Sequence, residues 1–295
     1  MANSTRYYHY DPSLPAAAIF ALLFLATTVF HIYQTTATKT WFFVPFCIGG
    51  VFETVGFAAR AVNAHQTPNW TLVIFVIQSM GILLAPALLA ASIYMEFGLL
   101  VDLTEGEKYS IVRRSLITKI FVTGDVLSFL FQAIGGSILA KQNPSSANLG
   151  KAIIEVGLFF QIIFFGLFLV NAINFSIKLR KQLTANRRSM PWQKHMMTLF
   201  TVGILIFVRC IYRVIEYMQG PQGNLMIHEI YIYILDAGLI LIAMVIFHLY
   251  HPSEISSLLR GGKVAVLFRV ENIVHKYSGL QLNTASSDVN LNRDV

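Results

Sequence analysis

The sequence predicts an all-α polytopic membrane protein with seven transmembrane helices. Of its 295 residues, 55% are hydrophobic and only 13% are charged, and the mean hydropathy is +0.61. Soluble globular domains carry about 25% charged residues, so this class is excluded. Apolar runs long enough to cross about 30 Å of hydrocarbon, which takes roughly 20 helical residues, recur along the chain. Basic residues gather in alternate connections between these runs, as in membrane proteins of defined orientation.

The predicted helices follow the apolar runs. They cover Pro15–Tyr33, Trp41–Val62, Thr71–Leu100, Leu116–Leu139, Lys151–Leu179, His195–Met218 and His228–Tyr250. A cleaved signal peptide is the alternative for the first run, but its leader contains one arginine and no basic cluster, so a retained helix is expected. The predicted organisation is a short extracytosolic segment (1–14), a transmembrane domain (15–252) and a cytosolic tail (253–295).

The orientation follows from the distribution of lysine and arginine. The connections after the first, third and fifth runs, together with the C-terminal tail, hold most of them, including a cluster within residues 178–194. The opposite connections hold only Arg6, Lys141 and Lys151. Because an excess of basic residues marks the cytosolic side, the N-terminus is predicted outside and the C-terminus in the cytosol. The net charge of +7 then belongs to an inner-facing membrane surface, and no nucleic-acid partner is expected.

Both ends of the chain carry weaker signals. Asn3 and Asn69 begin acceptor triplets for N-glycosylation, and both fall on the predicted outer side, so a glycoprotein is expected. In the tail, apolar residues spaced for one helical face predict a short helix on the cytosolic membrane surface. These residues are Val266, Val270, Ile273, Val274 and Tyr277. The residues from Ser278 onward are predicted to be disordered.

The most unusual stretch lies in the sixth run and reads R-C-I-Y-R-V-I-E. Charges at membrane depth are costly, so these side chains should have partners elsewhere in the chain. Arg209, Arg213 and Glu216 lie along one helical stripe, and the spacing favours a pair between Arg213 and Glu216. Arg209 then needs a carboxylate from another helix. Asp236 lies at a similar depth by helical rise and is the expected partner, with Glu53 as the second candidate.

Further polar residues lie in the membrane runs, most of them in the predicted outer half. The candidate ligand-binding residues are Glu53, Arg60, Asp125, Gln132, Gln161, Arg209, Arg213, Glu216, His228, Glu229 and Asp236. One interpretation is a hydrated, outward-facing polar cavity, because intramembrane ionisable residues are functional candidates by default. The alternative is a buried salt-bridge network that sets the register of the helices without touching a ligand.

Two other features of the runs have structural or chemical meaning. Pro86 lies inside the third run, where it frees a backbone carbonyl and is expected to kink the helix.

Four histidines gather near the predicted inner boundary: His31, His195, His248 and His251. Two of them could ligate a metal or a porphyrin, but no tight ligand motif accompanies them. Cys47 and Cys210 are the only cysteines and support neither a disulfide framework nor a zinc site. No metal and no cofactor are therefore expected.

These residues carry a resemblance to a known family. The sequence resembles the fungal lipid-translocating exporters, also called the resistance-to-aminocholesterol family, from about Tyr8 to Pro252. The matching motifs are Tyr10, Pro12 and Ser13; Glu53-x-x-Gly56-x-x-x-Arg60; Ala85-Pro86 with Ala90, Ala91, Ile93 and Tyr94; Asp125-x-x-Ser128-x-x-x-Gln132-x-x-Gly135-Gly136; Gly157-Leu158-x-x-Gln161; Arg209-x-x-Tyr212-Arg213-x-x-Glu216; His228-Glu229 before Asp236; and His251-Pro252. In this order the motifs are specific to the family.

The resemblance implies a multi-pass protein of fungal membranes, most often the plasma membrane. It implies binding of an amphipathic lipid such as a sphingoid base, assistance of its translocation or export, and resistance to toxic amphiphiles including drugs. The alternatives are a seven-helix lipid sensor that signals through cytosolic loops, and a protein that handles porphyrin or haem. The expected partners are membrane lipids or amphipathic small molecules. No enzymatic activity is expected, since nucleophile elbows and nucleotide-binding motifs are absent from the sequence.

Overall fold

The computed structural model describes residues 10–140, 144–182, 191–220, 222–267 and 269–272. Within them, seven helices are long and apolar enough to cross a membrane, which confirms the predicted fold class. The first four spans contain α1 (Leu14–Thr38), α2 (Val44–His65), α3 (Leu72–Leu103) and α4 (Arg114–Ala140). The next two are α5 (Pro144–Gln182) and α7 (Trp192–Gln219). The seventh joins the π-helical segment η3 (Ile232–Gly238) to α9 (Leu239–Leu249).

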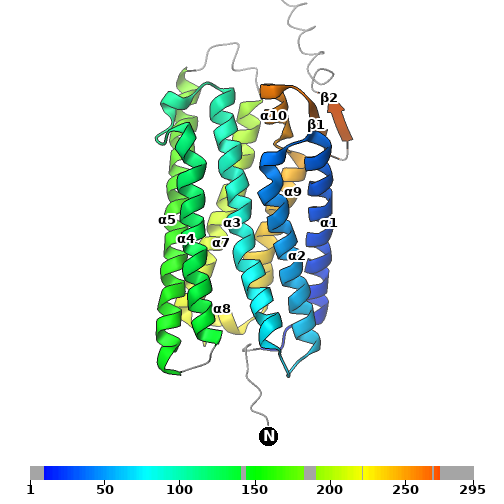
Figure 1. The fold of residues 1–295 in the computed structure, drawn as a ribbon, viewed down its shortest axis with the longest axis vertical. Helices are drawn as coiled ribbons and strands as arrows, with labels where there is room; N and C mark the ends of the chain where they lie inside the picture. Colours follow the sequence, from blue (N-terminus) through cyan, green and yellow to red (C-terminus); the bar gives the residue numbers. More distant parts are fainter. Residues whose placement is uncertain (1–9, 141–143, 183–190, 221, 268, 273–295) are drawn as a thin grey trace, which may run out of the picture.

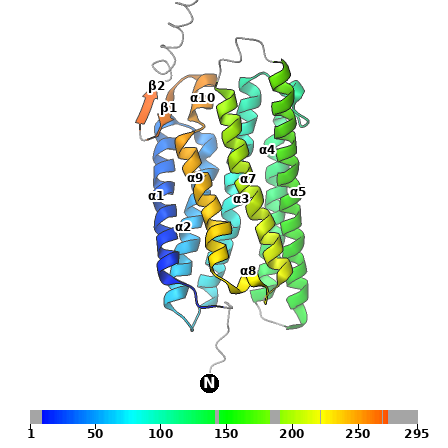
Figure 2. The same ribbon diagram turned by 180° about the vertical axis from the view of Figure 1, so that it is seen from behind.

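Shorter elements cap the two ends of the bundle (Figures 1 and 2). The 3₁₀ turns η1 (Trp41–Phe43) and η2 (Glu107–Tyr109) lie in the α1–α2 and α3–α4 connections. The short helix α8 (Asn224–Ile227) lies at the end where the chain begins. At the other end lie α10 (Ser253–Arg260) and the strands β1 (Lys263–Val266) and β2 (Arg269–Asn272). We call this other end the C-terminal end of the bundle. Which end faces the cytosol stays a prediction from the basic residues.

The helices run along the long axis of the molecule and pack mainly against their sequence neighbours. α9 packs on α1 and α7, and α3 also contacts α7 inside the bundle. The core is rich in aromatic rings, with Tyr94, Phe97 and Phe168 fully buried and meeting edge to face. Large apolar side chains remain exposed on the outer surface of the helices, as a bilayer requires.

Local sequence explains where α1 begins and ends. The Ser13 side chain accepts a hydrogen bond from the amide of Ala16, and Pro15 lies in the first turn, where its missing N–H costs nothing. Lys39 ends the helix in the left-handed region, with φ of 56°, and its amide bonds back to Thr35 and Thr36. The seventh span departs from the prediction, because His228 is extended and the helix is π-helical from Ile232 to Gly238.

The predicted interfacial helix in the tail is wrong for the part that the structure describes. Residues 263–266 and 269–272 form two antiparallel strands, with Val266 opposite Arg269. The reason is tertiary: the amide of Ala265 bonds to the Ser253 hydroxyl, and the Gln34 side chain donates to the carbonyl of Leu267. Hydrogen bonds to α10 and α1 thus hold the extended backbone in place. Ile273, Val274 and Tyr277, the tail from Ser278, and Asn3 lie outside the described residues.

Candidate functional site

The centre of the candidate site is an ion pair between α7 and the seventh span. The Arg209 Nε contacts the Asp236 carboxylate, and both side chains are 1% exposed. The predicted partner of Arg209 is therefore confirmed. Asp236 lies within the π-helical segment, a local widening of the helix that occurs often at functional positions.

Arg209 has a second partner that the sequence could have indicated. Its Nη2 donates to the backbone carbonyl of Ile82, 2.9 Å away. Ile82 precedes Pro86 by four residues, so the proline ring nitrogen cannot bond to this carbonyl as an ordinary helical amide would. The proline in α3 thus exposes an acceptor, and the arginine in α7 satisfies it.

Arg213 continues the cluster along α7. Its Nη1 lies 2.7 Å from Glu216 Oε2 and 3.7 Å from Asp236 Oδ2. The Tyr212 hydroxyl donates to the other oxygen of Glu216 at 3.0 Å. The predicted pair between Arg213 and Glu216 is confirmed, and Asp236 is shared by the two arginines.

Glu53 completes this set, which we call the central cluster: Glu53, Arg209, Arg213, Glu216 and Asp236. The Glu53 carboxylate is 1% exposed, and neither oxygen has a hydrogen-bond partner within the described part of the chain. Its charged neighbours are Asp236, Arg209 and Arg213. The central cluster therefore holds three carboxylates against two guanidinium groups.

The backbones of α2 and α3 approach closely beside Glu53. A Cβ atom on Gly81 would lie 2.9 Å from the carbonyl oxygen of Phe52 and 3.2 Å from the Cα of Gly56. Two glycines facing each other permit this contact, as small residues do between membrane helices. The close approach leaves little room for Glu53 to change its position without separating the helices.

A second ionic group lies nearer the end where the chain begins. Arg60 Nη2 lies 2.8 Å from Glu229 Oε1 and 2.7 Å from the Tyr10 hydroxyl, and its Nε donates to the Tyr233 hydroxyl. The amide of Ser13 also donates to both oxygens of Glu229. Burial raises the pKa of Tyr10, partly offset by the neighbouring Arg60, so this phenol stays neutral. This group ties the start of α1 to α2 and the seventh span.

The remaining predicted residues are held by other contacts. Gln132 donates to Ser128 and to Gln161, which joins α4 to α5. Asp125 accepts a hydrogen bond of 2.8 Å from the Tyr94 hydroxyl. His228 is exposed and does not join the buried groups, although its ring meets Tyr231 edge to face. The eleven predicted residues thus divide into several buried groups and one exposed side chain.

An ionic group that was not predicted from the sequence lies at the C-terminal end of the bundle. His195 Nε2 lies 3.0 Å from Glu254 Oε2, and its Nδ1 lies 3.8 Å from Glu96 Oε1. Lys194 also reaches Glu254 at 3.0 Å. His195 and Glu96 are fully buried. The available signal was Glu96 itself, an acidic residue within a predicted membrane run.

Three of the four predicted inner histidines lie together. The rings of His31 and His248 stack with centroids 3.7 Å apart, and His251 lies 6.3 Å from His31. His31 contacts the carbonyl of Met244, and His248 contacts the side chain of Gln34. Among the described residues, no group of three or more histidine, cysteine, aspartate or glutamate side chains is arranged to hold a metal ion.

The chain is similar to known proteins over most of its length. The family model described as "RTA1 like protein" matches residues 46–258. Protoporphyrin uptake protein 1 of Saccharomyces cerevisiae is 34% identical over 276 residues, which cover 81% of this chain and 90% of that protein. Protein RTA1 of the same yeast is 35% identical over 271 residues, covering 83% and 84%. The yeast sphingoid long-chain base transporter RSB1 is 26% identical over 262 residues, covering 75% and 67%.

No solved structure matches the chain. The family match spans six of the seven helices in full or large part, and the relatives extend over most of their own length. These matches lead to one conclusion. The chain belongs to the RTA1-like family of membrane proteins, which includes relatives named for sphingoid-base transport and for protoporphyrin uptake.

Proposed function

We propose that this protein binds a cationic amphiphile of the sphingoid-base class and assists its movement across the membrane without hydrolysing nucleotide. The observation that carries the proposal is the buried Glu53 carboxyl group of the central cluster. Glu53 is buried beside Arg209, Arg213 and Asp236, yet its oxygens have no hydrogen-bond donor among the described residues. A buried carboxylate of this kind is stabilised by an added cationic donor.

A protonated amine matches this requirement. It brings one positive charge and three N–H donors, and an attached acyl chain can remain among the exposed apolar side chains of the bundle. The relative named as a sphingoid long-chain base transporter supports the same class of cargo. Glu53 is 1% exposed, so cargo reaches it only when neighbouring helices separate. The proposed mechanism is therefore alternation between this closed arrangement and an open one.

The cellular role follows from the same proposal. Export of a membrane-active amine protects the cell from it, so we place the protein in a fungal plasma membrane, with its N-terminus outside and with resistance to toxic amphiphiles as its phenotype. Glycosylation at Asn69 fits this placement, since its side chain is exposed in the α2–α3 connection. The lipid-sensor alternative predicts saturable binding of the same amine without movement.

The test is transport by purified protein in vesicles that contain a labelled sphingoid base in one leaflet. The Glu53→Gln variant removes one negative charge at constant size, and the rate of transfer should fall at least about tenfold if one buried charge contact is lost. Glu155→Gln is the matched control, because Glu155 is partly exposed and pairs only with Lys151 among the described residues. Wild-type transfer by a folded Glu53→Gln protein would refute the proposal. Binding without transfer by the wild type would favour the sensor.

Porphyrin handling is the second candidate, and the stacked histidines at the C-terminal end favour it. His31 Nδ1, His248 Nε2 and His251 Nε2 lack hydrogen-bond partners within the described residues, and a relative is named for protoporphyrin uptake. Uptake of fluorescent protoporphyrin into the same vesicles distinguishes the two candidates. Loss of this uptake in His248→Gln, with sphingoid-base transfer retained, would support the porphyrin function.

A further inference from the structure

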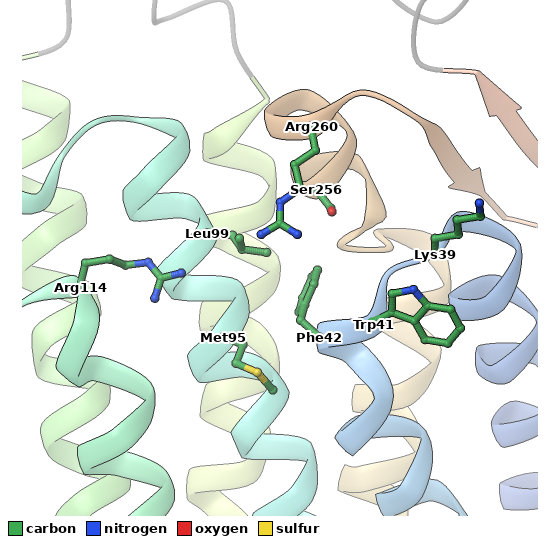
Figure 3. Close-up of a pocket in the computed structure, with 8 residues that line it drawn as sticks. All are labelled: Lys39, Trp41, Phe42, Met95, Leu99, Arg114, Ser256 and Arg260. Atoms are coloured by element: carbon green, nitrogen blue, oxygen red, sulfur yellow. The ribbon is translucent and has the colours of Figure 1, made fainter.

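A pocket at the C-terminal end of the bundle is separate from all the groups described above. It has a volume of about 200 Å³ and lies between the α1–α2 connection, α3, the start of α4, and α10 (Figure 3). Its lining residues are Lys39, Trp41, Phe42, Met95, Leu99, Arg114, Ser256 and Arg260. Three cationic residues and an apolar floor thus line one small space, with the guanidinium groups of Arg114 and Arg260 turned toward it and Lys39 extended outward above Trp41 in Figure 3.

The cationic side chains come from three different segments, and their charges are not balanced. Arg114 pairs with Asp102 through its Nε at 2.9 Å. Its guanidinium lies over Gly98, where a Cβ atom would overlap it, so the glycine lets the arginine lie across α3. Lys39 and Arg260 form no ion pair with any described residue. The pocket therefore carries about two positive charges in excess.

The apolar residues define the kind of molecule that fits. Met95, Leu99 and Phe42 lie below and beside Arg260 in Figure 3, and Trp41 lies at the rim. Trp41 is 63% exposed, and the indole ring is favoured at membrane interfaces. The volume is below the 300–1,000 Å³ typical of sites that enclose a whole small molecule. The pocket therefore suits the head of an amphiphile whose chains lie outside it, past Trp41.

We propose that this pocket binds an amphiphile with a phosphate monoester head. A phosphate monoester carries a charge of about −1.5 to −2 at pH 7 and offers three acceptor oxygens, which matches the excess of two cations and the Ser256 hydroxyl. Arginine binds phosphate through parallel N–H donors, and lysine as a point charge. The site lies at the opposite end of the helices from Glu229 and is independent of the proposed amine cargo.

The test uses fluorescence of tryptophan in phosphatidylcholine nanodiscs that contain the full-length protein. Phosphatidic acid with brominated acyl chains is titrated in, and the fluorescence of Trp41 should be quenched saturably. Of the other two tryptophans, Trp192 is fully buried and Trp70 lies in the α2–α3 connection, at the opposite end of the bundle from the pocket. Trp41→Phe identifies the signal. Two interfacial cations together strengthen the binding of an anionic lipid by about 30-fold. The double variant Lys39→Gln with Arg260→Gln should therefore raise the apparent Kd for phosphatidic acid by about this factor.

The matched control is the double variant Arg180→Gln with Lys181→Gln. These two exposed cations lie in the last turn of α5, at the same end of the bundle as the pocket but outside it. It should leave the Kd within about twofold. Equal loss in both double variants would overturn the proposal in favour of general attraction to the surface. Equal quenching by brominated phosphatidylcholine would also overturn it. Displacement by inorganic phosphate at the concentrations where the lipid binds would assign the pocket to free phosphate instead.

Discussion

The ion pair between Arg209 and Asp236 allows a direct measurement of how much the buried charges contribute to the free energy of unfolding. Both side chains are 1% exposed, so removal of either partner leaves a buried charge without its main counter-ion. Such a loss costs about 3–5 kcal/mol. Arg209→Met also removes the donor to the Ile82 carbonyl, while Asp236→Leu leaves that bond in place. Each single variant should therefore lower the free energy of unfolding by about 3–5 kcal/mol.

The double variant Arg209→Met with Asp236→Leu should lose much less than the sum of the single losses. No unpaired charge from this pair remains, Arg213 still contacts Glu216, and two apolar side chains of similar length fill the space. The expected coupling energy is at least about 2 kcal/mol. The assay is reversible unfolding of the purified proteins in mixed micelles, followed by circular dichroism.

The control is the pair between Lys151 and Glu155, which lies at 3.5 Å with side chains 36% and 28% exposed. The variants Lys151→Met and Glu155→Leu should each change the free energy of unfolding by less than about 1 kcal/mol, because solvent screens this pair. Losses at Arg209 and Asp236 that add to within about 0.5 kcal/mol would refute the coupling. Single losses as small as those of the control would refute the burial argument itself.

Three further predictions concern packing and local contacts. Gly81→Val should lower Tm by several degrees, because its Cβ would meet the Phe52 carbonyl, whereas Gly136→Ala should have little effect, since only the end of Met80 lies near it. Arg60→Met should cost about 1–3 kcal/mol in free energy of unfolding by micelle titration, less than Arg209→Met, because its partner Glu229 is 16% exposed. Ser253→Ala should speed amide hydrogen exchange in the hairpin by removing the bond to Ala265, with Ser256→Ala as the control; unchanged exchange would contradict the account of the tail.

The composition and the apolar runs were sufficient to predict the membrane helices, because each run must satisfy its own backbone hydrogen bonds in lipid. Helix spacing also predicted the pair between Arg213 and Glu216, and helical rise predicted that Asp236 lies level with Arg209. These inferences depend on one helix, or on two consecutive helices of known direction, and so need little tertiary information.

The failures share one cause. The interfacial helix was inferred from a stripe in an isolated segment, but hydrogen bonds from Ser253 and Gln34 hold this segment as a hairpin. His228 was assigned to the site from its depth alone, but its own backbone is extended and its side chain is exposed. The ionic group around His195 was missed because Glu96 and Glu254 lie far apart in sequence. Local periodicity contains no information on which helix faces which.

The sequence by itself determined the family, the class of fold, the seven spans and the presence of buried charges, since these depend on residue type and on lengths along the chain. Only the tertiary structure decided the contacts of these charges beyond the two predicted pairs. It joined the carbonyl freed by Pro86 to Arg209, left Glu53 without a donor among the described residues, and brought Lys39, Arg114 and Arg260 around one pocket. The physical reason is that a buried charge is stabilised by the few atoms within hydrogen-bond distance, and the packing of the helices sets which atoms these are.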